Sequence, residues 1–149
     1  MANPVFRDLR QEDLFTICKS YVETYNREPW NENWDYEIAK YRIEDMVMNP
    51  IALCYGVFIE HEYIGGIFGR RVYFITKKEL FIDEFFIDWK FQLKGYGTQL
   101  LKFATNDLYN KGFSKIVLNT EKRYPSYIFY ERNGFTELET MSMMYKDIK

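Results

Sequence analysis

Apolar residues recur along this chain at two different spacings. Short runs in which every second position is apolar are typical of β-strands, whereas a spacing of three to four residues is typical of amphipathic helices. The first pattern predicts seven strands, at 5–9, 51–59, 63–75, 80–88, 115–119, 135–138 and 141–146. The second predicts four helices, at 11–27, 35–49, 98–111 and 126–133.

Proline and glycine mark the ends of these helices. Pro29 and Pro50 follow the first and second helix, where each would stop helical hydrogen bonding. Gly112 stands where a left-handed residue commonly ends a helix. Pro125 and Gly134 bracket the last helix, which fits the usual preference for proline at the start and glycine after the end.

Two further patterns concern the strands and the second helix. The tripeptide at 60–62, Glu-His-Glu, predicts a hairpin turn with His61 exposed, and Gly65, Gly66 and Gly69 predict a bulge in the following strand. On the second helix, the period predicts that Ile38, Tyr41 and Val47 face the core.

The order of elements, β-α-α-β-β-β-α-β-α-β-β, predicts a mixed α/β fold. Its central twisted sheet of about seven strands is expected to be mostly antiparallel, with a helical crossover making the fourth and fifth strands parallel. A chain of 149 residues with 47% hydrophobic residues can bury one core, so a single domain over 1–149 is expected.

Charge and apolar length exclude several classes of function. Twenty basic against twenty-two acidic residues, without a basic stripe, argue against binding to nucleic acid or to an anionic membrane. The longest apolar run, 51–59, is far shorter than the ~20 residues of a membrane helix, and the first residues lack a signal-peptide pattern. Cys18 and Cys54 lack the spacing of a metal or redox site. A cytoplasmic protein with buried thiols and no metal is expected.

The segment 92–97, Gln-Leu-Lys-Gly-Tyr-Gly, lies between the fourth strand and the third helix. Its two glycines permit a tight turn with inward-facing amides, and the helix that follows would direct its own unpaired amides to the same place. Such a turn can bind a phosphate, although a plain connection has the same spacing. It is neither a dinucleotide fingerprint, because Leu100 replaces the third glycine, nor a nucleoside-triphosphate loop.

Three segments in this order resemble the GNAT superfamily, whose members transfer acetyl groups from acetyl-coenzyme A to amines. Residues 92–97 are similar to its pyrophosphate loop, 83–87 (Asp-Glu-Phe-Phe-Ile) to its fourth strand, and 129–135 (Phe-Tyr-Glu-Arg-Asn-Gly-Phe) to its Phe/Leu-Tyr-Glu-x-x-Gly-Phe segment. The resemblance implies the GNAT fold over essentially the whole chain. Two positions depart from it: Arg123 replaces a common asparagine, and Ser126 a common alanine.

The resemblance implies that acetyl-coenzyme A is the co-substrate. The amides from Leu93 to Thr98 would hold its pyrophosphate, the fourth strand would pair with its pantetheine arm, and amides near Phe86 and Ile87 would polarise the acetyl carbonyl. The residues expected to contact the coenzyme are Phe85, Phe86, Ile87, Gln92, Leu93, Lys94, Gly95, Tyr96, Gly97, Thr98, Arg123 and Ser126.

Two side chains are candidates for proton transfer. Glu84 ends a mostly apolar strand, where desolvation can turn a carboxylate into a base; Asp83 is its competitor, since alternation sends the two to opposite faces. A solvated carboxylate is the alternative for Glu84. Tyr130 is the candidate acid, because a phenol with a pKa near ~10 can protonate the leaving thiolate. Its alternative role is packing, since Tyr124, Tyr127 and Tyr130 recur at every third residue, as buried residues of a short helix also do.

The acceptor is inferred from the first third of the chain, which in GNAT proteins covers the mouth of the cleft. Trp30, Glu32 and Trp34 combine a carboxylate with indoles, which suits a small cationic amine; the same residues could instead join the two helices. The expected function is therefore direct acetyl transfer in a ternary complex to the primary amine of a small cationic molecule. There are two alternatives: acetylation of a protein or peptide, and a non-catalytic regulatory module that binds acyl-coenzyme A. A homodimer is compatible with the family.

Overall fold

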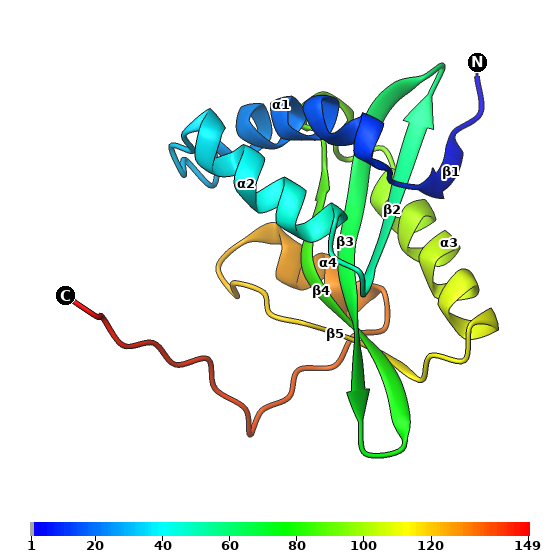
Figure 1. Cartoon of the computed structure of the whole chain (residues 1–149), viewed down its shortest axis with the longest axis vertical. Coiled ribbons are helices and arrows are strands. Elements are labelled where there is room, and N and C mark those ends of the chain that lie inside the picture. The colour runs from blue at the N-terminus through cyan, green and yellow to red at the C-terminus, as the bar shows by residue number, and fades with distance from the viewer. Residues whose placement is uncertain (1) are drawn as a thin grey trace. The chain divides into compact units, whose positions relative to one another are not determined.

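The computed structural model of the chain describes residues 2–149 (Figure 1). These form two compact units, one that ends at Asn119 and one that spans Thr120–Lys149. Each unit is described by itself. The elements of the first unit are β1 (Val5–Asp8), η1 (Gln11–Asp13), α1 (Leu14–Tyr25), α2 (Tyr36–Val47), β2 (Ala52–Ile59), β3 (Glu62–Phe74), β4 (Lys77–Ile87), η2 (Trp89–Phe91), α3 (Tyr96–Asn110) and β5 (Lys115–Leu118). The second unit contains α4 (Pro125–Arg132).

The first unit is built on a five-stranded sheet in the order β1-β2-β3-β4-β5. Neighbouring strands from β1 to β4 are antiparallel, and β5 is parallel to β4 after the crossover through α3. This confirms the predicted mixed fold and the parallel pair. The predicted hairpin turn is confirmed at Glu60 and His61, whose φ angles of 49° and 70° give the left-handed backbone of a tight β2–β3 connection.

Two bulges interrupt the sheet beside the glycines that predicted one. In β3, Val57 pairs with Gly65 but Phe58 pairs with Tyr63, which leaves Ile64 as an extra residue. In β4, Phe68 pairs with Glu84 but Gly69 pairs with Ile82, so Asp83 is the extra residue there. A bulge breaks the regular alternation of side chains. The surroundings of Asp83 and Glu84 therefore have to be taken from their contacts.

Helices cover both faces of the sheet. α1 and α2 lie together on one face, and α3 lies on the other (Figure 1). Ile17 of α1 and Ile43 of α2 are fully buried in the core beneath the helix pair, where each such side chain stabilises the fold by about 1.5–3 kcal/mol. On the opposite face Phe6 stacks on Phe103 of α3 with their ring centroids 5.4 Å apart.

The prediction of which residues of α2 face the core is wrong, because the buried side of the helix is shifted by about one residue. Ile38 and Tyr41 are 55% and 62% exposed, whereas Ala39 and Ile43 are completely buried. Val47 is only partly buried against the core. The small Ala39 allows close approach to α1, and Ile43 then fills the space beneath it. This rotation also turns the neighbouring Arg42 toward the sheet.

The two predicted C-terminal strands, 135–138 and 141–146, are absent from the described structure. Met141, Met143 and Tyr145 are 69%, 85% and 90% exposed, so the apolar alternation of this segment covers no core. An apolar period can favour a strand, but a strand also needs a neighbour to pair with its backbone. In residues 2–149 the sheet consequently has five strands instead of about seven.

An acid-sensitive ion pair ties the end of β1 to the start of the helical layer. Both guanidinium Nη atoms of Arg7 donate to the carboxylate of Asp13, at 2.8 and 2.9 Å, and the backbone amide of Arg10 donates to it at 2.8 Å. Burial alone would raise the pKa of Asp13, but the hydrogen bonds from Arg7 and Arg10 outweigh burial and lower it.

We expect Asp13→Asn to flatten the acid limb of the stability curve. Because the folded state lowers this pKa, the contribution of Asp13 is complete above its unfolded value of about 3.9 and is lost as pH falls. The variant should lose about 2 kcal/mol at neutral pH and show a shallower decline between about pH 5 and pH 2. Urea unfolding across that range measures both quantities; parallel curves for the two proteins would contradict the assignment.

Candidate functional site

In the described residues, the last part of β4 extends beyond its pairing with β5 before the glycine turn begins. Pairing with β5 stops at Ile82, whereas β4 continues to Ile87. The amide of Asp88 donates to the carbonyl of Ile64 in β3, at 2.7 Å, and because amide directions alternate along a strand, that of Ile87 faces away from β3. On the same outer side, the side-chain amide of Gln92 donates to the Ile87 carbonyl at 2.9 Å.

The turn that follows has the geometry of an anion site. Leu93 and Gly95 have φ angles of 62° and 87°, and α3 begins immediately afterwards at Tyr96. The amide of Gln99 donates to the Gly95 carbonyl at 3.1 Å, so the amides of Tyr96, Gly97 and Thr98 precede the first hydrogen bond of α3. Alternating left-handed residues and a helix N-terminus gather such amides around a concave site with positive potential. A diphosphate therefore fits this part of the chain.

Two lysines add positive charge beside the turn. The ammonium nitrogens of Lys90 and Lys94 lie 6.0 and 5.8 Å from the ring centroid of Phe91. Both lysines are exposed, as Leu93 and Gly95 are. A phosphate approaching the turn would consequently meet cationic side chains as well as backbone amides.

Glu84 lies at the centre of a polar cluster between β4 and the helix pair. Its Oε1 accepts a hydrogen bond from the hydroxyl of Tyr25 at 2.6 Å. Its Oε2 accepts from the hydroxyl of Tyr21 at 3.2 Å and from Nη2 of Arg42 at 3.0 Å. Arg42 also donates to the Tyr21 hydroxyl, at 3.2 Å. The cluster joins α1, α2 and β4 around one carboxylate.

The environment sets the protonation of the groups around Glu84. Burial, and next the negative charge of Glu84, raise the pKa of Tyr21 far above its ordinary value, so this phenol remains a donor. Burial alone would lower the pKa of Arg42, but its hydrogen bond and charge interaction with Glu84 raise it. Asp83 has a different partner, because Nε of Arg70 lies 3.2 Å from its Oδ2. The two neighbouring carboxylates therefore belong to separate ion pairs.

The aromatic loop between α1 and α2 packs onto this cluster. Trp34 meets Tyr21 edge to face at 5.1 Å between centroids, and Trp30 meets Tyr25 in the same way at 5.0 Å. Both indoles lie against the hydrophobic core, and the Nε1 of Trp34 donates to Oε1 of Glu32 at 2.7 Å. The loop residues predicted to receive the acceptor thus border Glu84 through Tyr21 and Tyr25.

The second unit holds the remaining predicted site residues. The ring of Tyr130 packs edge to face on Phe129 and Phe135, with centroids 5.5 and 5.2 Å away. Arg123 is exposed and forms an ion pair with Glu121 at 3.0 Å. The hydroxyl of Ser126 lies 3.2 Å from that of Thr120 and shares a hydrogen bond with it.

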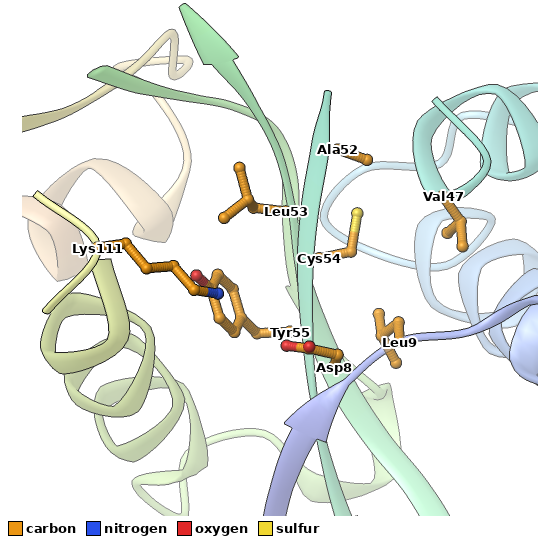
Figure 2. Close-up of a pocket in the computed structure, with 8 residues that line it drawn as sticks. All are labelled: Asp8, Leu9, Val47, Ala52, Leu53, Cys54, Tyr55 and Lys111. Atoms are coloured by element: carbon orange, nitrogen blue, oxygen red, sulfur yellow. The ribbon is translucent and has the colours of Figure 1, made fainter. Parts of the chain in front are cut away.

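A small cavity in the first unit is not part of this arrangement. It measures about 160 Å³ and lies between β1, β2 and the ends of α2 and α3 (Figure 2). Its lining contains Cys54, whose pKa burial raises to about 12, so the thiol there is unreactive. None of the predicted site residues lines it, and its volume is below the roughly 300 Å³ of a small-ligand pocket.

In residues 2–149, no three or more His, Cys, Asp or Glu side chains are grouped so that they could hold a metal ion. Over the same residues, none of the helices combines the length and apolarity needed to cross a membrane.

Sequence reasoning missed three residues that contact Glu84. Tyr21 and Tyr25 are both buried on α1, one helical turn apart, but the spacing of apolar residues does not reveal the partners of their hydroxyls. Arg42 was missed because the predicted face of α2 was misplaced. A signal was available: a single arginine beside the buried Ala39–Ile43 stripe requires a partner for its charge.

A model of the acetyltransferase (GNAT) family matches residues 12–135, which is most of the chain. The chain belongs to the GNAT acetyltransferase family. This family uses acetyl-CoA, which contains a diphosphate of the kind that fits the glycine turn. Comparison with curated protein sequences finds no significant match.

Solved structures share the fold of this GNAT protein along its whole length. One is a possible acetyltransferase from Clostridium difficile 630, with a TM-score of 0.84, 16% identity, and coverage of 98% of this chain and 99% of that one. A ribosomal-protein-alanine N-acetyltransferase from Brucella melitensis biovar Abortus 2308 has a TM-score of 0.76, 14% identity and coverage of 97% and 100%. An aminoglycoside N-acetyltransferase in complex with CoA has a TM-score of 0.75, 14% identity and coverage of 100% and 97%.

Proposed function

We propose that this protein transfers the acetyl group of acetyl-CoA directly to the primary amine of a small cationic molecule in a ternary complex. One observation carries the proposal: the part of β4 beyond its pairing with β5 leads into a left-handed turn at Leu93 and Gly95, followed at once by the first amides of α3. A pantetheine arm can pair with such an edge while its diphosphate rests on such a turn.

The chemistry requires three groups. The amine nitrogen attacks the acetyl carbonyl carbon, the carbon–sulfur bond breaks, the amine loses a proton and the thiolate gains one. The outward amide of Ile87 is the proposed donor to the carbonyl oxygen, because a fixed backbone amide stabilises the negative charge that develops there. The neighbouring backbone at Phe85 and Phe86 is assigned to the pantetheine arm.

Glu84 is the proposed proton acceptor, directly or through a water. An ionised carboxylate offers about four acceptor positions, and Tyr21, Tyr25 and Arg42 occupy three of them. One position remains for the proton of the amine or of a bound water.

Tyr130 is the proposed acid for the leaving thiolate. Its position in the Phe-Tyr-Glu-x-x-Gly-Phe segment, residues 129–135, supports this assignment. Arg123 and Ser126 are assigned to coenzyme contacts on the same sequence basis. The alignment of solved GNAT structures along both units supports our view that 1–149 forms one catalytic domain.

Charge around the helix pair supports a cationic acceptor. Residues 23–45 contain seven carboxylates and three cationic side chains, an excess of four negative charges in a chain with a net charge of −2. Glu28, Glu32, Asp35, Glu37 and Glu44 are exposed there. Such a field raises the local concentration of cationic molecules. Trp30 and Trp34 supply aromatic surface beside it, and we place the protein in the cytoplasm, where acetyl-CoA is available.

Two alternatives remain distinguishable by experiment. The likeness to a ribosomal-protein-alanine N-acetyltransferase favours testing protein and peptide acceptors, and a non-catalytic acyl-CoA-binding module would keep the turn without the chemistry. The purified protein should release thiol from acetyl-CoA with at least one of a panel of polyamines, aminoglycosides, amino acids and peptides. Thermal stabilisation by CoA without turnover on any amine would favour the binding module.

The glycine turn provides a matched test of coenzyme binding. We expect Gly95→Ala to cost about 1–2 kcal/mol of stability, because alanine is strained at a φ of 87°, and to weaken CoA binding about tenfold. Gly112→Ala is the control: its φ is 83°, but it lies beyond the other end of α3. Calorimetric titration with CoA should separate the two variants. Equal losses of affinity would show that strain, and not the turn, determines binding.

A further inference from the structure

A buried carboxylate anchors the segment that leads into the glycine turn. Asp88 is 3% exposed and lies directly between β4 and η2. Its Oδ2 accepts a hydrogen bond from the hydroxyl of Ser20 in α1, at 2.6 Å. Its Oδ1 accepts from the backbone amide of Lys90 at 2.9 Å, so one carboxylate joins α1 to the first turn of η2.

The next residue, Trp89, forms a second set of contacts between η2 and the C-terminal part of α1. The backbone amide of Trp89 donates to the hydroxyl of Thr24, one turn beyond Ser20 in α1, at 3.1 Å. The guanidinium of Arg27 lies over the Trp89 ring, 3.6 Å from its centroid. Thr24 is completely buried, so its hydroxyl serves this contact without competition from solvent.

The anchored segment ends where the exposed turn begins. Gln92 is still held, through its side chain, by the Ile87 carbonyl. The next residues, Leu93, Lys94 and Gly95, are all exposed. We therefore expect the place of the turn amides to depend on what fixes residues 88–92, because the three residues that follow are exposed.

We propose that Asp88 and Ser20 are positioning residues for the coenzyme: they hold the glycine turn at the place where it receives the diphosphate. This inference rests on the proposed acetyltransferase function. Neither residue touches the coenzyme in the proposal. They act through the backbone of η2, which determines where the amides from Leu93 to Thr98 point.

Helix α1 also contacts Glu84, the proposed proton acceptor. Tyr21 and Tyr25 of α1 bind Glu84, whereas Ser20 and Thr24 of α1 bind residues 88 and 89. α1 thus fixes two places that one coenzyme molecule has to reach at once. A displacement between two places that hold one molecule weakens the binding of that molecule. A loosened Asp88 connection should accordingly affect the coenzyme before it affects the acceptor.

Asp88→Asn tests the connection with little change in shape. The amide retains one acceptor oxygen, but it removes the charge and places a donor opposite either Ser20 or the Lys90 amide. In the full-length protein, the Kd for CoA measured by calorimetry should rise about tenfold, and the KM for acetyl-CoA should rise in parallel while kcat stays within about threefold. Ser20→Ala keeps the carboxylate, and it should raise the same constants by a smaller factor.

Asp13→Asn is the matched control, because it makes the same substitution in a buried carboxylate near the other end of α1, which also accepts a backbone amide. It should lower the melting temperature and leave the Kd for CoA within about twofold of wild type. Wild-type affinity in both Asp88→Asn and Ser20→Ala would overturn the inference alone. An equal rise in Asp13→Asn would overturn it as well, whereas a wild-type protein that binds no CoA would overturn the proposed function.

Discussion

Replacing Glu84 with Gln should lower kcat by about 10²- to 10³-fold, with a smaller effect on the KM for acetyl-CoA. The amide can still accept hydrogen bonds from Tyr25 or Arg42, but it cannot take a proton from the amine. The deficit should be largest at low pH and should narrow as pH approaches the pKa of the acceptor amine, about 10 for an alkylamine such as lysine. At high pH the acceptor arrives already neutral, so Glu84 is no longer needed to produce the attacking amine.

Two control variants separate this role from structural effects. Asp83→Asn alters the neighbouring carboxylate, which is paired with Arg70, and should leave the pH profile of kcat unchanged. Tyr25→Phe removes the 2.6 Å hydrogen bond to Glu84 while keeping the ring against Trp30, and should reduce kcat less than Glu84→Gln does. Steady-state rates from acidic to alkaline pH measure all three. A Glu84→Gln profile parallel to wild type would remove Glu84 from the mechanism.

Replacing Tyr130 with Phe should lower kcat by about 10²-fold or more, because only the hydroxyl that protonates the thiolate is lost. The phenylalanine ring can keep the edge-to-face contacts with Phe129 and Phe135, so α4 should remain folded. The loss should be smaller for acyl donors whose leaving thiol is more acidic, since a stable thiolate needs less protonation. Rates with acetyl-CoA and with an activated thioester would show this difference.

Tyr127→Phe is the control for this experiment. Tyr127 lies in the same helix, and its hydroxyl bonds to Glu137 at 3.4 Å. Its removal should leave kcat within about twofold of wild type, as expected for most exposed polar contacts. A Tyr130→Phe enzyme that turns over at the wild-type rate would rule out the acid role, and an equal loss in Tyr127→Phe would indicate a general disturbance of α4.

Local rules predicted most of the first unit. The glycines at 65, 66 and 69 marked the bulge in β3, although not the second one at Asp83 of β4, and the hairpin turn at Glu60 and His61 was also predicted. These features depend on a few neighbouring residues, which a sequence displays directly. The strands predicted at 135–138 and 141–146 failed because pairing depends on a distant partner, and the apolar period of that segment contains no information about one.

The candidate site was predictable only in part for the same reason. The turn before α3 could be located because glycine spacing and a following helix are local properties. The partners of Glu84 could not, since Tyr21, Tyr25 and Arg42 reach it from helices more than 40 residues earlier, along separations of 63, 59 and 42 residues. Whether Arg42 faces the sheet depends on which side of α2 is buried. Both Ile38 and Ile43 fit a helical spacing of apolar residues, so the sequence did not show which of them faces the core.

The most direct test of this account is a crystal structure of the protein with coenzyme A. The account predicts that the diphosphate accepts hydrogen bonds from the amides between Leu93 and Thr98, and that the pantetheine arm follows the outer edge of β4 past Ile87. The sulfur should then lie on the same edge as Glu84. Coenzyme A bound elsewhere on the protein, with the Leu93–Thr98 amides facing only solvent, would contradict the account.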